Sequence, residues 1–200
     1  MSHLIGQKAP DFTAQAVMEN DEMKELTLSE YLKGSYGLIF FYPLDFTFVC
    51  PSEIIAFSNR MDKFSALNTK VVGVSVDSQF SHYAWRNTPT NKGGLGQIKF
   101  PLVADLTKQI ATDYGVLIED AGVALRGSFL IDKEGNIRHY VINDLPLGRN
   151  VDESIRMVEA LQFHEEHGEV CPAGWQKGEE GMKDTAEGVA SYLASHAEEL

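Results

Sequence analysis

The sequence is poor in positive charge and has no long hydrophobic segment. It contains 17 Lys and Arg against 29 Asp and Glu, which gives a formal net charge of −12. Nucleic acids and anionic membrane surfaces are bound mainly through Lys and Arg, so this balance argues against both as partners. No apolar stretch approaches the roughly 18 residues that span a bilayer. The first residues also lack the basic and apolar regions of a signal peptide, and we therefore expect a soluble, cytoplasmic protein.

Cysteine is scarce, since only Cys50 and Cys171 occur among 200 residues. A chain of this length can bury roughly 70% of its unfolded surface, so its core needs no disulfide. In the cytoplasm thiols are normally reduced, and a disulfide there is usually transient and catalytic. The count alone favours two inert, buried thiols. A reactive role must therefore be argued from the residues around each cysteine.

Hydrophobic patterning predicts an α/β fold with a central mixed sheet flanked by helices. Continuous apolar runs are typical of buried strands, and two strands on either side of a short turn are typical of a hairpin. Apolar residues three to four positions apart are typical of helices. On these grounds we expect strands at 11–18, 36–42, 70–76, 102–104, 126–131 and 137–141, and helices at 26–32, 52–67, 79–86, 106–114 and 151–167. After Gly168 the chain becomes polar and rich in glycine. We expect a domain over 1–167 and a C-terminal arm over 168–200 that ends in a helix at 185–200.

Cys50 lies at the predicted entrance of a helix. It follows the apolar strand 36–42 after a short loop, and Pro51 comes directly behind it. Proline is favoured at the first helical position, because its missing N–H would have no partner there anyway. The exposed backbone N–H groups and the dipole of a helix N-terminus favour an anion. For a cysteine that anion is the thiolate, which is the nucleophilic form.

The residues around both cysteines resemble one known family. Pro43, Thr47 and Cys50 match the Pro-x-x-x-Thr-x-x-Cys motif of peroxiredoxins. The segment 170–175, which carries Cys171, resembles the resolving-cysteine segment of the typical two-cysteine subgroup, of the bacterial alkyl hydroperoxide reductase or thioredoxin peroxidase type. Segment 125–129 resembles the strand that supplies the family's active-site arginine, here Arg126. The resemblance covers nearly the whole chain in the right order.

The resemblance implies a thioredoxin-like fold and thiol-dependent reduction of hydrogen peroxide and organic hydroperoxides, with no cofactor and no metal. Cys50 would become a sulfenic acid, and Cys171 of the partner subunit would condense with it to a disulfide. A thioredoxin-like or flavoprotein-linked dithiol reductant would then recycle the enzyme. The resemblance also implies homodimers, often assembled into rings of dimers such as decamers.

The same resemblance assigns roles to further residues. Thr47, Cys50 and Arg126 would bind the peroxide, and Pro43 would shield the thiolate from water. Glu53 and Arg149 would form a polar network that orients Arg126. Considered alone, Thr47 is more typical of a hydroxyl that caps a turn, and each arginine of a surface charge that contributes little to stability. Their positions within the family's motifs favour the catalytic roles.

The sequence also allows other interpretations, among them a zinc site and general disulfide exchange. His164, His167 and Cys171 are possible zinc ligands, but the histidines are three positions apart and no fourth ligand is evident. A solvated helix end explains them better, since His suits the C-terminal dipole. General disulfide exchange usually uses Cys-x-x-Cys, whereas Ser52 and Glu53 follow Pro51 here. A chaperone role stays open as a second activity.

The C-terminal arm also bears on overoxidation. In eukaryotic relatives a Gly-Gly-Leu-Gly loop packs with a C-terminal Tyr-Phe pair, which slows local unfolding and exposes the sulfenic acid to further peroxide. This chain has the loop at 93–96, but the pair is Tyr192-Leu193. The resemblance therefore predicts intermediate sensitivity to overoxidation.

Overall fold

The computed structural model describes residues 3–198 and 200. The chain divides into two compact units, Met1–Val151 and Asp152–Leu200. The predicted domain boundary after residue 167 lies inside the second unit and stays a prediction. Within the described residues, no helix combines the length and the apolar character needed to cross a bilayer.

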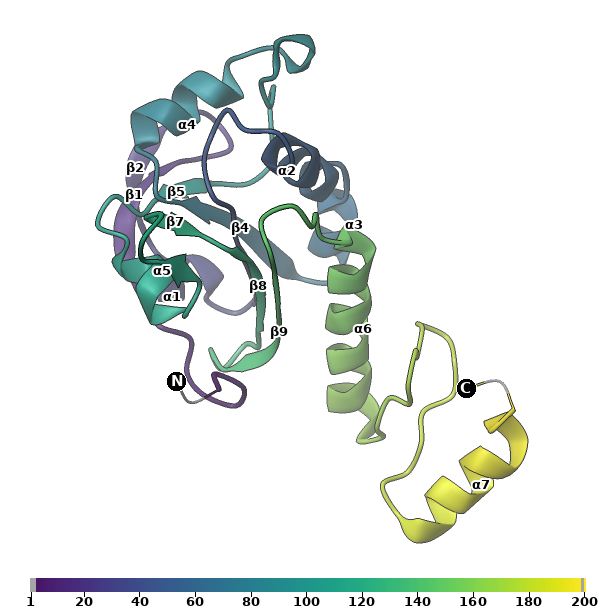
Figure 1. The fold of residues 1–200 in the computed structure, drawn as a ribbon. Helices are drawn as coiled ribbons and strands as arrows, with labels where there is room; N and C mark the ends of the chain where they lie inside the picture. Colours follow the sequence, from purple (N-terminus) through teal and green to yellow (C-terminus); the bar gives the residue numbers. More distant parts are fainter. Residues whose placement is uncertain (1–2, 199) are drawn as a thin grey trace. The chain divides into compact units, whose positions relative to one another are not determined.

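A seven-stranded mixed sheet forms the centre of the first unit (Figure 1). The strand order is β2-β1-β5-β4-β3-β8-β9. The central strands β3, β4 and β5 run parallel, whereas β1, β2, β8 and β9 are joined to the sheet by antiparallel pairing. The strands are β1 (Thr13–Val17), β2 (Met23–Thr27), β3 (Tyr36–Phe41), β4 (Thr69–Ser75), β5 (Leu102–Ala104), β8 (Arg126–Ile131) and β9 (Ile137–Asn143). This arrangement confirms the predicted α/β class.

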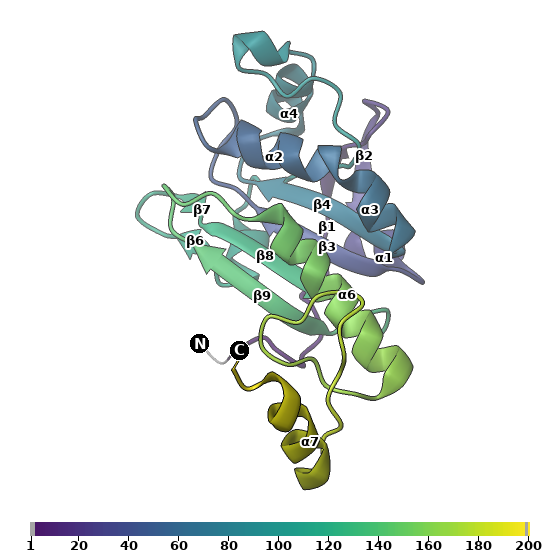
Figure 2. The same ribbon diagram turned by 90° about the vertical axis from the view of Figure 1, so that its right-hand side faces the viewer.

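The two faces of the sheet pack against different helices, because successive side chains of β3 point to opposite sides. Ile39 and Phe41 belong to a buried cluster that includes residues of α1 (Leu28–Leu32) and α5 (Gln109–Asp113). On the other face Phe40 stacks on Phe57 of α2 (Cys50–Asn59), with ring centroids 4.4 Å apart. Figure 2 shows α2 and α3 (Met61–Ala66) lying across β3 and β4. The Phe40 stack thus fixes α2, whose first residue is Cys50, close to the end of β3.

Helix α4 (Gln79–Arg86) follows β4 and matches its predicted bounds. Ser78 caps it, since its side chain accepts a hydrogen bond from the Ser81 backbone N–H. After α4 come the short 3-10 helix η1 (Thr90–Lys92) and the glycine-rich loop at 93–96. Trp85 Nε1 donates to Gly93 O at 2.8 Å and so ties this loop to α4.

In the second unit, α6 (Val151–His167) has the predicted bounds and is followed by an arm and by α7 (Ala186–His196). The arm is ordered by an isolated bridge between Val170 and Met182. Trp175 is buried, and its ring lies 4.8 Å from that of Phe163 of α6. The predicted C-terminal arm is therefore structured, and its last helix is shorter than expected.

The structure corrects the expectation of a helix at 26–32. Met23–Thr27 is strand β2, and Leu26 pairs with Ala14 of β1. Only Leu28–Leu32 is helical. Leu26 and Leu28 are both buried, and an apolar pair two positions apart suits a strand that leads into a helix.

Two further helices differ from expectation, and two short strands were not predicted. The helix expected at 52–67 is divided at Arg60, whose backbone leaves the helical region (φ −105°, ψ 6°). The helix expected at 106–114 begins only at Gln109, because Lys108 takes a left-handed conformation (φ 63°) and the Asp105 carboxylate accepts bonds from the N–H groups of Ile110 and Ala111. The short strands β6 (Leu117–Ile118) and β7 (Val123–Ala124) had no predicted counterpart.

Candidate active site

Cys50 is the first residue of α2, and Pro51 is the second. This agrees with the expectation of a thiol at a helix entrance. The loop from Tyr42 to Val49 connects β3 to this helix. Within it Phe46 has a positive φ of 54°, which turns the chain sharply just before Thr47. Cys50 is wholly buried in this conformation.

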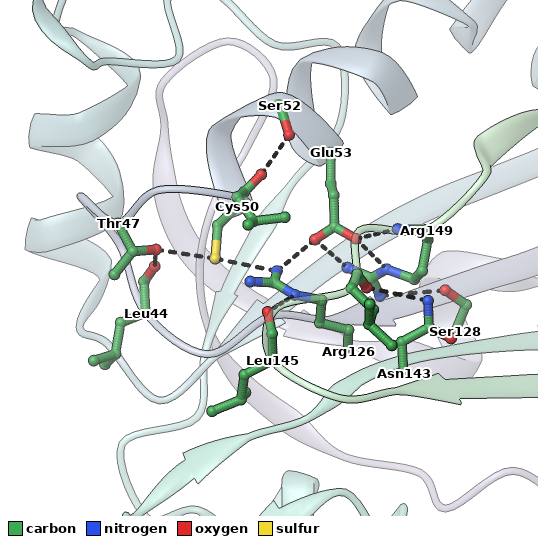
Figure 3. A network of polar contacts seen from close by, with 12 residues as sticks. Leu44, Thr47, Cys50, Ser52, Glu53, Arg126, Ser128, Asn143, Leu145 and Arg149 are labelled. Carbon is green, nitrogen blue, oxygen red and sulfur yellow. Dashed lines mark hydrogen bonds and ion pairs between the residues drawn. The ribbon is translucent and has the colours of Figure 1, made fainter.

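Two hydrogen-bond donors flank the sulfur from opposite sides (Figure 3). Thr47 Oγ1 lies 3.0 Å from Cys50 Sγ, and Arg126 Nη1 lies 3.4 Å from it. Thr47 Oγ1 is also 2.8 Å from Leu44 O. A hydroxyl carries a single hydrogen, so Thr47 can donate to the carbonyl or to the sulfur but not to both. When the sulfur is a thiolate, it competes as the charged acceptor, and charged acceptors form the stronger hydrogen bonds.

Arg126 is fixed in place by two other acceptors. Its Nε donates to Leu145 O at 2.7 Å, and its Nη1 donates to Glu53 Oε2 at 2.6 Å. The side chain is only 4% exposed. A planar guanidinium held at two points has little freedom to swing away from the sulfur. The cation is therefore prepositioned beside Cys50.

Glu53 joins Arg126 to a second buried arginine, Arg149. Arg149 donates to the Glu53 carboxylate through Nε at 2.8 Å, through Nη2 at 3.0 Å and through its backbone N–H at 2.8 Å. Burial acts to raise the pKa of Glu53, but the hydrogen bonds and charge of Arg149, with a further contribution from Arg126, hold it below its usual value. Glu53 is thus an anion that binds both arginines.

Arg149 is itself held by β8 and by the aromatic core. Its Nη1 donates to Gly127 O at 2.7 Å, and its guanidinium lies over the ring of Phe40 at 5.2 Å. Burial lowers the pKa of Arg149 from its ordinary value, while Glu53 opposes that effect. The sequence-predicted residues Thr47, Cys50, Glu53, Arg126 and Arg149 are therefore brought together in one connected network.

Comparison with known proteins identifies the family. Residues 5–140 match the AhpC/TSA family, and residues 160–195 match the C-terminal domain of 1-Cys peroxiredoxin. The chain belongs to the AhpC/TSA family. Alkyl hydroperoxide reductase C of Helicobacter pylori is 57% identical over 198 residues, which cover 98% of this chain and 100% of that relative. Peroxiredoxin-1 of Gekko japonicus is 55% identical over 192 residues, which cover 96% of each.

Solved structures agree with this assignment. The reduced 2-Cys peroxiredoxin of Plasmodium vivax superposes with a TM-score of 0.94 at 48% identity, covering 97% of this chain and 100% of that one. AhpC of Enterococcus faecalis gives a TM-score of 0.79 at 41% identity, covering 86% of this chain and 100% of that one. The predicted thioredoxin-like fold and peroxiredoxin class are confirmed. The chain is a thiol-dependent peroxidase.

Other sequence-predicted residues of this peroxiredoxin lie outside the network. Pro43 is buried at the start of the loop, and its shielding role stays a prediction. Cys171 belongs to the second unit, where its Sγ donates to Ala160 O at 3.4 Å. Burial raises the pKa of the Cys171 thiol, and the positive charge of Arg156 partly offsets this. A raised pKa keeps the Cys171 thiol protonated at neutral pH.

The alternative zinc ligands have other partners. His164 Nδ1 lies 2.8 Å from Glu169 O, and His167 Nδ1 lies 3.1 Å from Phe163 O. Across residues 3–198 and 200, no cluster of three or more His, Cys, Asp or Glu side chains is placed to hold a metal ion.

Sequence reasoning missed a buried polar group behind the active-site loop. Asp45, which lies inside the Pro43–Cys50 motif, is bonded to His82 of α4 and to Tyr42. All three residues are buried. The one signal was an acidic residue among the mostly apolar residues of this motif, and nothing in the sequence names its partners.

Proposed function

We propose that this peroxiredoxin reduces hydrogen peroxide and organic hydroperoxides through Cys50, with Thr47 and Arg126 as the groups that bind the peroxide. The thiolate sulfur attacks one peroxide oxygen, so an S–O bond forms as the O–O bond breaks. Sulfur loses two electrons, the peroxide gains them, and the leaving oxygen takes up a proton as water or an alcohol. Cys50 is left as a sulfenic acid.

The observation that carries this proposal is the pair of donors around Sγ, at 3.0 Å from Thr47 and 3.4 Å from Arg126. An ordinary thiol is about 3% thiolate at pH 7, so complete ionisation gains at most about thirtyfold. Enzymes typically accelerate reactions by about 10⁶-fold or more. The remaining factor must come from stabilising the negative charge that spreads over S, O and O as the bond breaks. Arg126, a permanent cation with several donors, is suited to that task.

In this proposal Glu53 and Arg149 act through Arg126. Glu53 Oε2 accepts from Arg126 Nη1 at 2.6 Å, the same nitrogen that approaches the sulfur. Three hydrogen bonds from Arg149 keep the Glu53 carboxylate from following Arg126 if that side chain moves. Pro43, at the start of the loop, limits the access of water to the thiolate.

The second half of the cycle uses Cys171 of a partner subunit within a homodimer. Its thiol condenses with the Cys50 sulfenic acid, which releases water and forms a disulfide. A thioredoxin-like or flavoprotein-linked dithiol protein then reduces the disulfide by thiol exchange, and itself becomes oxidised. We place this cycle in the cytoplasm, where such reductants keep thiols reduced. Rings of dimers are the proposed assembly.

The test compares Cys50→Ser, Thr47→Val and Cys171→Ser. Peroxide consumption should vanish in Cys50→Ser and fall severely in Thr47→Val, which keeps the side-chain shape but removes the hydroxyl. Cys171→Ser should reduce about one equivalent of peroxide in a single burst and then fail to turn over, because the sulfenic acid has no thiol partner and reacts further only with excess peroxide. Near-normal turnover by Cys50→Ser would refute the proposal, and a monomeric band after oxidation on a non-reducing gel would refute resolution between subunits.

A further inference from the structure

Behind the active-site loop, the carboxylate of Asp45 is held by three side chains. Its Oδ2 accepts from Ser81 Oγ at 2.7 Å and lies 2.8 Å from His82 Nδ1. Its Oδ1 accepts from Tyr42 Oη at 2.9 Å. The Asp45 backbone N–H donates to Asp77 Oδ2 at 2.8 Å. Asp45 is therefore anchored through both its side chain and its main chain.

His82 is the centre of this anchor and is fully buried. Its Nε2 lies 3.1 Å from Val103 O, and a carbonyl can only accept, so Nε2 must carry a hydrogen. Its Nδ1 faces the Asp45 carboxylate, and that contact is favourable when a proton lies between the two groups. A charge-assisted hydrogen bond of this kind is about twice as strong as one between neutral groups.

Helix α4 grips the loop at a second point. Trp85, one turn after Ser81 and His82, lies with its ring 5.6 Å from that of Phe46. Phe46 has the positive φ noted above, and a residue other than glycine keeps such a conformation only when its surroundings enforce it. One face of α4 therefore holds Asp45 and Phe46, the two residues immediately before Thr47.

The contacts of α4 with Asp45 and Phe46 bear on the formation of the disulfide at Cys50. Cys50 is wholly buried in the first turn of α2. A disulfide requires the two sulfur atoms to approach to about 2.05 Å with their β-carbons about 3.8 Å apart, so the loop and the first turn must open before another cysteine can reach Cys50. The loop residues nearest to Thr47 are those that α4 holds.

We propose that His82 and Ser81 are positioning residues that hold the loop closed through Asp45, and that the strength of this anchor sets how fast Cys50 leaves its pocket. The anchor keeps Thr47 beside the sulfur during peroxide attack and delays the disulfide. A long-lived sulfenic acid can react with a second peroxide, which forms a sulfinic acid and releases water. The inference rests on the proposed function only for this chemical consequence.

The test uses Ser81→Ala and His82→Asn, with Ser78→Ala as the matched control. Ser78→Ala removes the N-cap hydrogen bond to the Ser81 backbone N–H of the same helix, but it removes none of the side-chain bonds to Asp45. Asn at position 82 is uncharged and too short to reach both Asp45 and Val103 O. The readout is amide hydrogen exchange of the loop, residues 44–49, in the reduced full-length protein. We expect exchange to accelerate about threefold or more in Ser81→Ala and about tenfold or more in His82→Asn, and to stay within about twofold in Ser78→Ala.

A second readout measures the consequence for the chemistry. The peroxide concentration that converts half of Cys50 to sulfinic acid, measured by mass spectrometry during turnover, should rise in the same order. Exchange rates and sulfinic thresholds like those of Ser78→Ala would overturn the inference, and Ser81→Ala decides the matter if His82→Asn does not fold. If loop exchange accelerates as expected but the parent protein reacts with peroxide no faster than free cysteine, the anchor stands and the proposed function fails.

Discussion

Replacement of Arg126 by Gln removes the cation beside the sulfur and shortens the side chain, so that no donor reaches Cys50 Sγ or Glu53. At 3.4 Å, a unit charge attracts a thiolate by roughly 5 kcal/mol at an effective dielectric constant of about 20. Part of that attraction already exists before the reaction and does not lower the barrier. Removal of one donor aimed at developing charge typically costs about 3–4 kcal/mol, or 10²- to 10³-fold. We expect a loss of that size in the second-order rate constant for peroxide.

The structure indicates that Arg126→Gln should still fold. Glu53 loses one of four hydrogen bonds but keeps all three from Arg149. Arg126→Lys should recover only part of the rate, because one ammonium group cannot replace the guanidinium at Leu145 O, at Glu53 and at Sγ together. The matched control is Arg138→Gln, which removes an arginine paired with Asp132 in the β8–β9 region.

The assay is stopped-flow peroxide reduction under single-turnover conditions, with each variant also unfolded in urea to compare stabilities. Arg138→Gln should retain the parent rate constant. An Arg126→Gln rate constant within about threefold of the parent would refute the claim that this cation stabilises the negative charge that develops as the O–O bond breaks.

Three other outcomes follow from the same contacts. Glu53→Gln leaves two buried arginines without their anion and should lower the free energy of unfolding by about 3–5 kcal/mol, measured by urea denaturation. Because the pKa of Glu53 is lowered in the folded state, its stabilising effect is present above the ordinary carboxyl pKa of about 4.3 and is lost as the pH falls through the lower, folded value. The stability gap between the parent and Glu53→Gln should thus shrink below about pH 4, and a gap that is constant from pH 7 to pH 3 would contradict the assignment. The Cys171 thiol, whose pKa burial raises, should be alkylated at pH 8 more slowly in the folded protein than in urea, and equal rates would show that the burial has no effect. Cys171→Ser should form no covalent dimer after one equivalent of peroxide, whereas the parent should.

Local patterns predicted the part of the site that lies on contiguous sequence. The apolar strand, the short loop and the Cys50-Pro51 pair place a thiol at a helix N-terminus, and that placement needs no distant contact. Arg126 and Arg149 could not be found in this way. They lie 76 and 99 positions after Cys50, and only the resemblance to peroxiredoxins connected them to it.

Local sequence patterns could not predict the hydrogen bonds that hold Asp45 behind the loop. Asp45 and His82 are 37 positions apart, and neither belongs to a spacing that signals chemistry. Their pairing depends on how α4 packs, which is a tertiary property. The error at 26–32 has a similar origin, since pairing of Leu26 with β1 outweighs the helical tendency of the residues that follow.

The most direct test of the account is the rate at which Cys171→Ser protein, with Cys50 as its only thiol, is oxidised by hydrogen peroxide at pH 7, relative to free cysteine under identical conditions. Ionisation of an ordinary thiol explains at most about a thirtyfold difference. We expect a ratio well above 10³. Only stabilisation by Thr47 and Arg126 of the negative charge that develops as the O–O bond breaks can supply it. A ratio at or below thirtyfold would contradict the account, because the two donors would then do no more than favour the thiolate over the thiol.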